Sequence, residues 1–269
     1  MAPTYELPTP DYQVDGFEAA TEQIRDDFAF TMLAHGLFIT LAAHHRADGR
    51  DSYLLLYDQS AIWDIPGTAE YVAVHITRDV EQRTFDFTSE RHPVAPLAQN
   101  WLKRQGCPQE AAEASSSHGP RPADALTARL EDLLRTNSGD RYEVLDHYTD
   151  NPGSFDFGVE VRTLVYDSHP NSARTPYRLF LEETTRDLRS YTVREGAFTS
   201  AEEADTWIME RESPLPLAPD PQGVVGRRTS AARARSTVTS NGLAVAPAPV
   251  SPPRSAGEPA PTRSRGGTR

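Results

Sequence analysis

The hydrophobic positions from residue 16 to residue 35 recur with the period of a helix. Asp15 and Glu18 have the spacing of a capping box, which often opens a helix. Apolar residues then follow at three- and four-residue intervals along one face: Phe17, Ala20, Ile24 and Phe28. Gly36 supplies the left-handed residue that commonly ends a helix. The pattern predicts a helix over residues 16–35.

Four β-rich runs follow this helix. Residues 37–45 and 53–57 form a predicted hairpin, because the Asp48-Gly49 step between them favours a tight reversal. Residues 71–76 and 83–87 are two more predicted strands. Pro93 then introduces a helix that ends near Lys103. The order of elements is therefore α-β-β-β-β-α.

The second half of the chain has the same order. Its first helix has a leucine-rich face and ends at residues 137–139; that face contains Leu126, Leu130, Leu133 and Leu134. Strands are predicted at residues 142–148, 155–165, 177–181 and 189–193. In the second of these, Phe155, Phe157, Val159 and Val161 alternate with polar residues, which is typical of an antiparallel sheet with one wet face. Thr199 and Glu202 form a capping box before a last helix with Ala204, Trp207 and Ile208 on its buried face.

Short sequences also recur between the two halves at a nearly constant spacing, which is the signature of a duplicated unit. Leu56-Tyr57-Asp58 returns as Val165-Tyr166-Asp167, Thr77–Val80 as Thr185–Leu188, Tyr71 as Tyr177 and Trp101 as Trp207. The predicted fold class is α+β, with two similar α-β-β-β-β-α units at residues 16–105 and 122–212. Residues 1–15 form an N-terminal extension in this scheme.

Composition separates a linker and a tail from these units. Residues 106–121 are rich in proline, alanine, serine and glycine, and are interpreted as a linker. Residues 213–269 contain no aromatic residue and no sustained hydrophobic period. Because such a segment buries too little apolar surface to offset the entropy of ordering, a disordered C-terminal tail is expected.

Charge divides at the same boundary. Residues 1–212 carry a net charge of −18, and the tail carries +6 with eight arginines. Nucleic acid and anionic membrane surfaces repel so acidic a body. Only the tail offers weak phosphate contacts, through Arg227, Arg228, Arg233 and Arg235.

Other features bound the class of protein. The first residues lack the basic and apolar regions of a secretory signal, and the longest apolar stretch, residues 28–43, is short of a membrane span. A single cysteine, Cys107, excludes an intramolecular disulfide and fits a reducing cytoplasm. One lysine against 26 arginines indicates a GC-rich and, we expect, actinobacterial genome.

The best candidate for a metal or catalytic site is a group of histidines near the first hairpin. It comprises His35, His44 and His45, with Asp48 and Asp51 nearby. Adjacent histidines on a strand point to opposite faces, however, and the HxH and HxxxH spacings of metal sites are absent. We therefore expect no metal and no cofactor.

No other motif indicates catalysis. The pairs Asp156 with Glu160 and Glu182 with Glu183 are interpreted as solvated carboxylates, since acid–base catalysis needs environments that separate two pKa values. The sequence contains no G-x-S-x-G elbow, P-loop or G-x-G-x-x-G segment. No catalytic or cofactor-binding residue is predicted.

The recurrent pairs have two interpretations. An aspartate at a strand end can accept backbone N–H bonds and close a turn, so Tyr-Asp and Thr-Arg-Asp would repeat because the fold repeats. The alternative is two equivalent ligand or partner sites at Arg78-Asp79 and Arg186-Asp187. Trp101 and Trp207 are expected to anchor the terminal helices in the core.

Three hypotheses of function remain. The first is a cytoplasmic, non-enzymatic interaction protein whose acidic, pseudo-dimeric body binds a protein or peptide. The second is an accessory protein of a mobile element or nucleoprotein complex, tethered by its arginine-rich tail. The third is a hydrolase-type enzyme that uses His35, His44 or His45. No membrane partner is expected.

Overall fold

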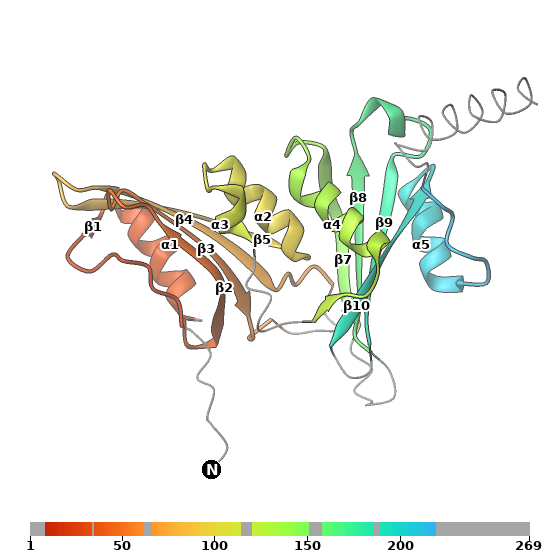
Figure 1. Cartoon of the computed structure of the whole chain (residues 1–269), viewed down its shortest axis with the longest axis horizontal. Coiled ribbons are helices and arrows are strands. Elements are labelled where there is room, and N and C mark those ends of the chain that lie inside the picture. The colour runs from red at the N-terminus through yellow and green to blue at the C-terminus, as the bar shows by residue number, and fades with distance from the viewer. Residues whose placement is uncertain are drawn as a thin grey trace, which may run out of the picture. The chain divides into compact units, whose positions relative to one another are not determined.

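The computed structural model describes residues 9–33, 35–61, 66–113, 120–150, 158–185 and 189–218. We call residues 9–113 the first repeat and residues 120–218 the second repeat; both belong to one compact unit of the chain (Figure 1). The described part of the chain contains no helix that is long and apolar enough to cross a membrane.

The two repeats share one succession of main elements, β-α-β-β-β-β-α, and differ in the position of a 3-10 turn and in the additional helix α3. The first has β1 (Glu18–Ala19), α1 (Glu22–Met32), the 3-10 turn η1 (His35–Leu37), β2 (Phe38–His45), β3 (Asp51–Asp58), β4 (Tyr71–Asp79), β5 (Thr84–His92), α2 (Ala95–Arg104) and α3 (Gln109–Ala112). The second has β6 (Arg121–Pro122), α4 (Ala125–Thr136), β7 (Tyr142–Asp150), β8 (Glu160–Asp167), the 3-10 turn η2 (Pro170–Ser172), β9 (Tyr177–Thr184), β10 (Ser190–Phe198) and α5 (Ala201–Glu210).

The sheets have the same topology. Their strand orders are β1-β5-β4-β3-β2 and β6-β10-β9-β8-β7, with one short parallel strand at an edge and antiparallel pairs elsewhere. This confirms the α+β fold with two similar antiparallel units.

The registers also agree, which allows residues in the shared helices and strands of the two repeats to be matched. Phe38 pairs with Asp58 as Tyr142 pairs with Asp167, and a bulge follows two residues after the first member of each pair. Tyr71 and Tyr177 begin β4 and β9, and Trp101 and Trp207 are both the seventh residue of their helices. We call such matched residues counterparts.

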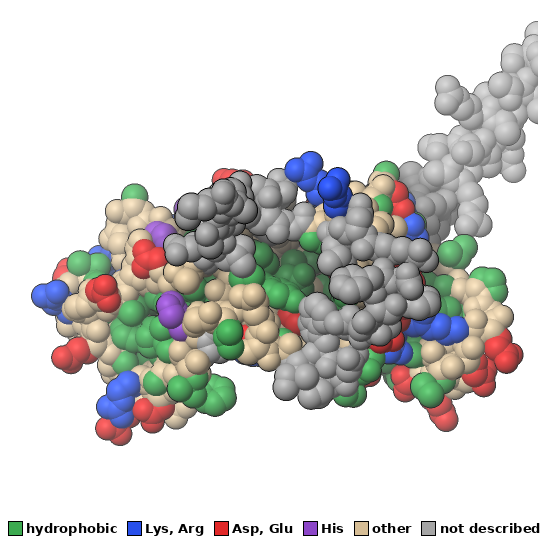
Figure 2. All heavy atoms as spheres, turned by 90° about the horizontal axis from the view of Figure 1, so that it is seen from below, with side chains coloured by type: hydrophobic (Ala, Val, Ile, Leu, Met, Phe, Trp, Pro, Cys, Tyr) green, Lys and Arg blue, Asp and Glu red, His purple; other side chains and the backbone are tan. Residues whose placement is uncertain are grey.

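Each face of the first sheet is covered by helices. The side beneath α1 is apolar and includes Leu54, Val74 and Ile76, all fully buried. The opposite side packs against α2 and α3 through Leu55, Ala98 and Leu102. In the second repeat, α4 covers one face and α5 the other. On the face shown in Figure 2, hydrophobic side chains gather between the repeats, and charged side chains lie mainly on their outer parts.

Helices α2 and α4 lie side by side and join the repeats in a contact that we call the seam (Figure 1). Val94 and Leu97 from the first repeat share a hydrophobic cluster with Leu130 and Leu134 from the second. Polar groups complete the contact: Asn100 Nδ2 donates to the backbone oxygens of Arg135 at 2.9 Å and Asn137 at 3.1 Å. Burial of apolar surface on both helices stabilises the pair.

The first helix begins six residues later than the sequence predicts. Gly16 has φ +80°, a left-handed conformation that breaks the expected first turn. The backbone N–H groups of Glu18 and Ala20 donate instead to Arg83 O and Phe85 O, forming β1. Thr21 then caps α1 by accepting the N–H of Ile24.

Other boundaries also differ from those expected. Cys107 is buried and α3 packs on the sheet, so the start of the expected linker belongs to the first repeat. Residues 213–218, assigned to the tail from sequence, contact β10: Ala197 N donates to Pro216 O at 2.9 Å, and Leu215 packs near Phe198. The cap of α5 is Ser200, one residue after the predicted Thr199. Phe155, Phe157 and residues 219–269 lie outside the described residues.

Truncation experiments test the corrected end of the body. A chain ending after Glu212 should lose about 2 kcal/mol and melt roughly 4 to 8 °C lower, because Leu215 and the bonds to Pro216 and Ser213 are removed. A chain ending after Ala218 should melt like the full chain by calorimetry, since the remaining tail has no aromatic residue. Equal melting temperatures of the two truncated chains would show that residues 213–218 do not stabilise the body, which would then end at residue 212.

Candidate functional site

The recurrent aspartates close turns, as the structural interpretation predicts. Asp58 ends β3 and accepts the N–H of Ser60 at 2.9 Å; Asp167 ends β8 and accepts the N–H of His169 at 3.0 Å. Both are buried and paired with an arginine: Arg91 at 2.7 Å and Arg141 at 2.8 Å. These hydrogen bonds hold the pKa of each carboxyl below its usual value despite burial, which raises it.

Asp79 also closes a turn, whereas Arg78 is a buried clamp. Asp79 accepts the N–H groups of Glu81 and Gln82 at 3.0 and 2.9 Å. Arg78 is 4% exposed and donates to the backbone oxygens of Tyr12, Gln13 and Gly49 and to Ser52 Oγ. Its guanidinium therefore ties the N-terminal segment to the first hairpin.

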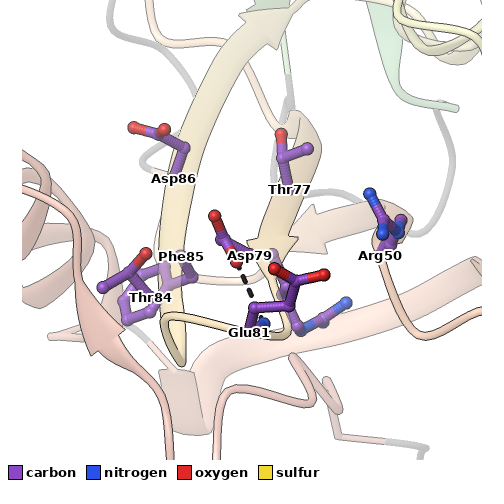
Figure 3. Close-up of a pocket in the computed structure, with 8 residues that line it drawn as sticks. Arg50, Thr77, Asp79, Glu81, Thr84, Phe85 and Asp86 are labelled. Carbon is purple, nitrogen blue, oxygen red and sulfur yellow. Dashed lines mark hydrogen bonds between the residues drawn. The ribbon is translucent and has the colours of Figure 1, made fainter.

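A depression of about 340 Å³ lies beside these two residues (Figure 3). Its lining side chains from the adjoining strands include Thr77, Asp79 and Asp86, and Asp79 points toward the N–H of Glu81. Because most of the lining is solvent-exposed and the donors of Arg78 are directed at the chain itself, the depression has the properties of an open turn.

The proposed equivalence of Arg78-Asp79 with Arg186-Asp187 is not supported by the register. Counting from Tyr71 and Tyr177, the counterpart of Arg78 is Thr184, the last residue of β9. Arg186 and Asp187 themselves lie outside the described residues, as do the tail arginines Arg227, Arg228, Arg233 and Arg235.

The three histidines of the first repeat have separate neighbours. His45 Nδ1 lies 2.7 Å from Ser52 Oγ, His44 stacks on Tyr53, and the His35 ring is 5.8 Å from Tyr12. His44 and His45 thus point to opposite faces of the sheet, as expected from strand geometry. In the described ranges, no three His, Cys, Asp or Glu side chains converge closely enough to hold a metal ion.

Comparison of counterparts reveals a different candidate, on the sheet face beneath α4. In the first repeat, Phe28 of α1 packs 5.2 Å from Phe85 of β5, above the buried Ile76. Their counterparts are Glu131, Tyr191 and Glu182. The phenylalanine contact becomes a hydrogen bond from Tyr191 Oη to Glu131 Oε1, and the isoleucine becomes a third polar residue. The first repeat shows that this fold accommodates apolar residues at these three positions. Because buried polar groups are costly, their presence in the second repeat points to a role other than packing.

A carboxylate of the first repeat joins this group across the seam. Glu70 precedes β4, is 3% exposed and accepts a hydrogen bond from Thr149 Oγ1 of β7 at 2.6 Å. Its second oxygen, Oε2, has no hydrogen-bond partner among the described residues. We call Glu70, Glu131 and Glu182 the seam carboxylates.

The seam carboxylates share an environment that disfavours ionisation. Burial, followed by the charges of Glu131 and Glu70, raises the pKa of Glu182 to about 7. Burial also raises the pKa of Glu70 and of Glu131, although their hydrogen bonds oppose the shift. The pKa of Tyr71 is well above its usual value because of burial and the charge of Glu182, so this ring adjoins the cluster.

The acidic residues at the other end of the same face are compensated. Arg178 lies 3.7 Å from both Asp167 and Glu195, and Arg141 binds Asp167 through two nitrogens at 2.8 Å. No such ion pair is formed by the seam carboxylates with any arginine or lysine that the structure describes. Among the described acidic residues of this face, the seam carboxylates therefore lack the arginine partners that Asp167 and Glu195 have.

A cavity of about 340 Å³ is lined by both repeats; the seam carboxylates do not line it, but Ala69, which precedes Glu70, does. Three buried lining residues have a polar atom without a hydrogen-bond partner in the described structure: Tyr142 Oη, His92 Nε2 and His147 Nε2. Burial, with a smaller effect of Arg104, lowers the pKa of His92 to about 4, so it is neutral at pH 7. His147 also lowers the pKa of Glu70, which links the cavity to the seam carboxylates.

No family model, curated protein or solved structure matches this chain.

The prediction that Glu182 and Glu183 are both solvated carboxylates holds for Glu183 only. Glu183 is exposed, but Glu182 faces α4 and the seam. A comparison of the two repeats within the sequence could have indicated this, because Glu182 occupies the position at which the first repeat has the apolar Ile76.

Replacing Arg78 tests its structural role. Arg78→Met should lower the free energy of unfolding by about 3 to 5 kcal/mol, because three backbone oxygens and Ser52 lose their donor. Arg50→Met, at an exposed arginine of the same depression, should change it by less than about 0.5 kcal/mol. Urea unfolding measures both. A loss below about 1 kcal/mol for Arg78→Met would reopen its role as a ligand residue.

The raised pKa of Glu182 predicts a pH-dependent stability. Since the folded protein holds this proton more tightly, the contribution of Glu182 to stability is most favourable below its ordinary pKa of 4.5 and declines until about pH 7. Above pH 7.5, Glu182→Gln should be more stable than the native chain by about 1 to 3 kcal/mol, with the advantage vanishing near pH 4.5. Glu183→Gln is the exposed control. Denaturant unfolding from pH 4.5 to 8 measures these stabilities. A difference in unfolding free energy between Glu182→Gln and the native chain that did not vary with pH would contradict the prediction.

Proposed function

We propose that this protein is a non-enzymatic interaction protein that binds a protein or peptide partner at the seam. The observation that supports the proposal is the exchange of Phe28, Phe85 and Ile76 for Glu131, Tyr191 and Glu182 between counterparts. Buried charge without a counterion destabilises a fold, so its concentration in one copy of a duplicated core favours a role in recognition.

The seam carboxylates do not resemble an acid–base pair. Catalysis of that kind needs two groups whose pKa values are separated, whereas Glu70, Glu131 and Glu182 all shift upward. A binding role uses the same groups without this requirement, because a partner can supply the missing hydrogen bonds and charge.

The surroundings of the seam suit a macromolecular partner. Tyr71, Tyr191 and Glu182 are partly exposed, so a side chain of a partner can reach them. Tyrosine combines large apolar area with a hydrogen-bonding group and is enriched at protein interfaces. The buried Cys107, whose pKa burial raises to about 11, is an unreactive thiol that is compatible with the proposed cytoplasmic location.

Selection from a random 12-residue peptide library displayed on phage tests this function. The native chain should enrich peptides whose binding falls at least tenfold when Glu131 and Glu182 are both replaced by glutamine. Glu183→Gln should bind them normally, since Glu183 faces away from α4. Failure to enrich any peptide, or equal binding by the double variant, would contradict a peptide site at the seam.

A further inference from the structure

The seam carboxylates lack a cation within the part of the chain that the structure describes. Arg135 is the arginine whose charge lowers the pKa of Glu131, but its Nε donates to Gln99 Oε1 at 2.7 Å and it lies 3.9 Å from Asp132. Glu70 provides a second observation: it is 97% buried, its Oε2 has no hydrogen-bond partner among the described residues, and its charge acts on Glu182. Thr149, which binds Glu70, and Glu182 both pair with Val161, so they lie in one row across the second sheet, and Tyr191 holds Glu131 over the same face.

Aromatic rings adjoin these acceptors. Tyr71 and Tyr57 form an edge-to-face pair with ring centroids 5.6 Å apart, and both Glu182 and Glu70 act on the Tyr71 hydroxyl. Tyr191 donates to Glu131 and contributes a third ring. Carboxylates beside aromatic faces attract organic cations through charge and through the ring quadrupole.

The spacing of the acids favours an extended cation over a bare metal ion. Described His, Cys, Asp and Glu side chains do not converge in threes at metal-binding distance. A guanidinium has five N–H donors in a planar fork, stacks on aromatic rings and is weakly hydrated, so it can bridge separated carboxylates at lower desolvation cost than an ammonium.

We propose that the seam carboxylates bind the guanidinium of an arginine side chain. The guanidinium lies between Glu70, Glu131 and Glu182 and beside the rings of Tyr71 and Tyr191. The inference rests on the proposed binding function and specifies its ligand chemistry. Two sources can supply the group: an arginine of a partner, or one of the eight arginines of residues 213–269 of this chain.

Fluorescence anisotropy at pH 8 tests the proposal with a labelled synthetic peptide of residues 226–236, which contains Arg227, Arg228, Arg233 and Arg235. The matched control peptide has citrulline, the neutral isostere, at all four positions. Proteins are the full chain, the Glu131→Gln/Glu182→Gln variant, Glu183→Gln, and a tail variant with glutamine at the four arginines. Because glutamine preserves size and removes buried charge, the seam variant should remain folded, which its melting curve verifies.

We expect the arginine peptide to bind at least tenfold more tightly than the citrulline peptide, and this preference to disappear in the seam variant alone. Equal binding by the full chain and the tail variant would assign the site to a partner's arginine. Tighter binding by the tail variant would assign it to the chain's own tail, which then competes. No binding, or a preference that survives in the seam variant, overturns the inference. If the phage selection enriched peptides that lack arginine but still require Glu131 and Glu182, the arginine inference would be overturned and the proposed binding function would stand.

Discussion

Helix α2 is packed on both sides, and the arrangement of the two repeats depends on this. Ala98 and Leu102 face the first sheet, whereas Val94 and Leu97 face α4 of the second repeat. A helix covered by a sheet and by a second helix is held in one position, since displacement would expose apolar surface on either side. The same position brings Glu70 of the first repeat within hydrogen-bonding distance of Thr149 in the second. The acidic group at the seam thus follows from a hydrophobic contact.

The differences between the two repeats explain why no further repeat can pack in the same way and how the second core came to contain polar residues. The counterparts of the seam residues Leu97 and Leu130 are Glu203 and Asp27, both exposed and charged, so α5 and α1 do not offer the same apolar contact to further copies. Beneath α1 the core is apolar, whereas beneath α4 it includes Glu131 and Glu182. One repeat retains an apolar core, and its stability allows the other to tolerate destabilising polar groups.

Local patterns predicted most of the fold because the hydrophobic periods of helices and strands and the tight turns between them are encoded within a few residues. Gly49 with φ +71° turns the first hairpin as Asp48-Gly49 indicated, and both tryptophans anchor their helices. The failures have nonlocal causes. β1 is two residues long and is defined by its pairing with β5, and Cys107 is buried by a sheet distant in sequence. Glu182 resembled a solvated strand end until α4 and the first repeat were placed against it.

The titration of Glu182 distinguishes an unneutralised acidic site in the second core from a set of solvated carboxylates. Carbon-detected NMR of the glutamate side-chain carboxyls, in the native chain and in Glu131→Gln, gives its midpoint. A pKa of about 7 is expected for Glu182 in the native chain and a lower value in the variant, because removal of the Glu131 charge relieves repulsion. A midpoint near the ordinary 4.5, unchanged by Glu131→Gln, would show that this carboxyl is solvated and that the second core holds no such acidic site.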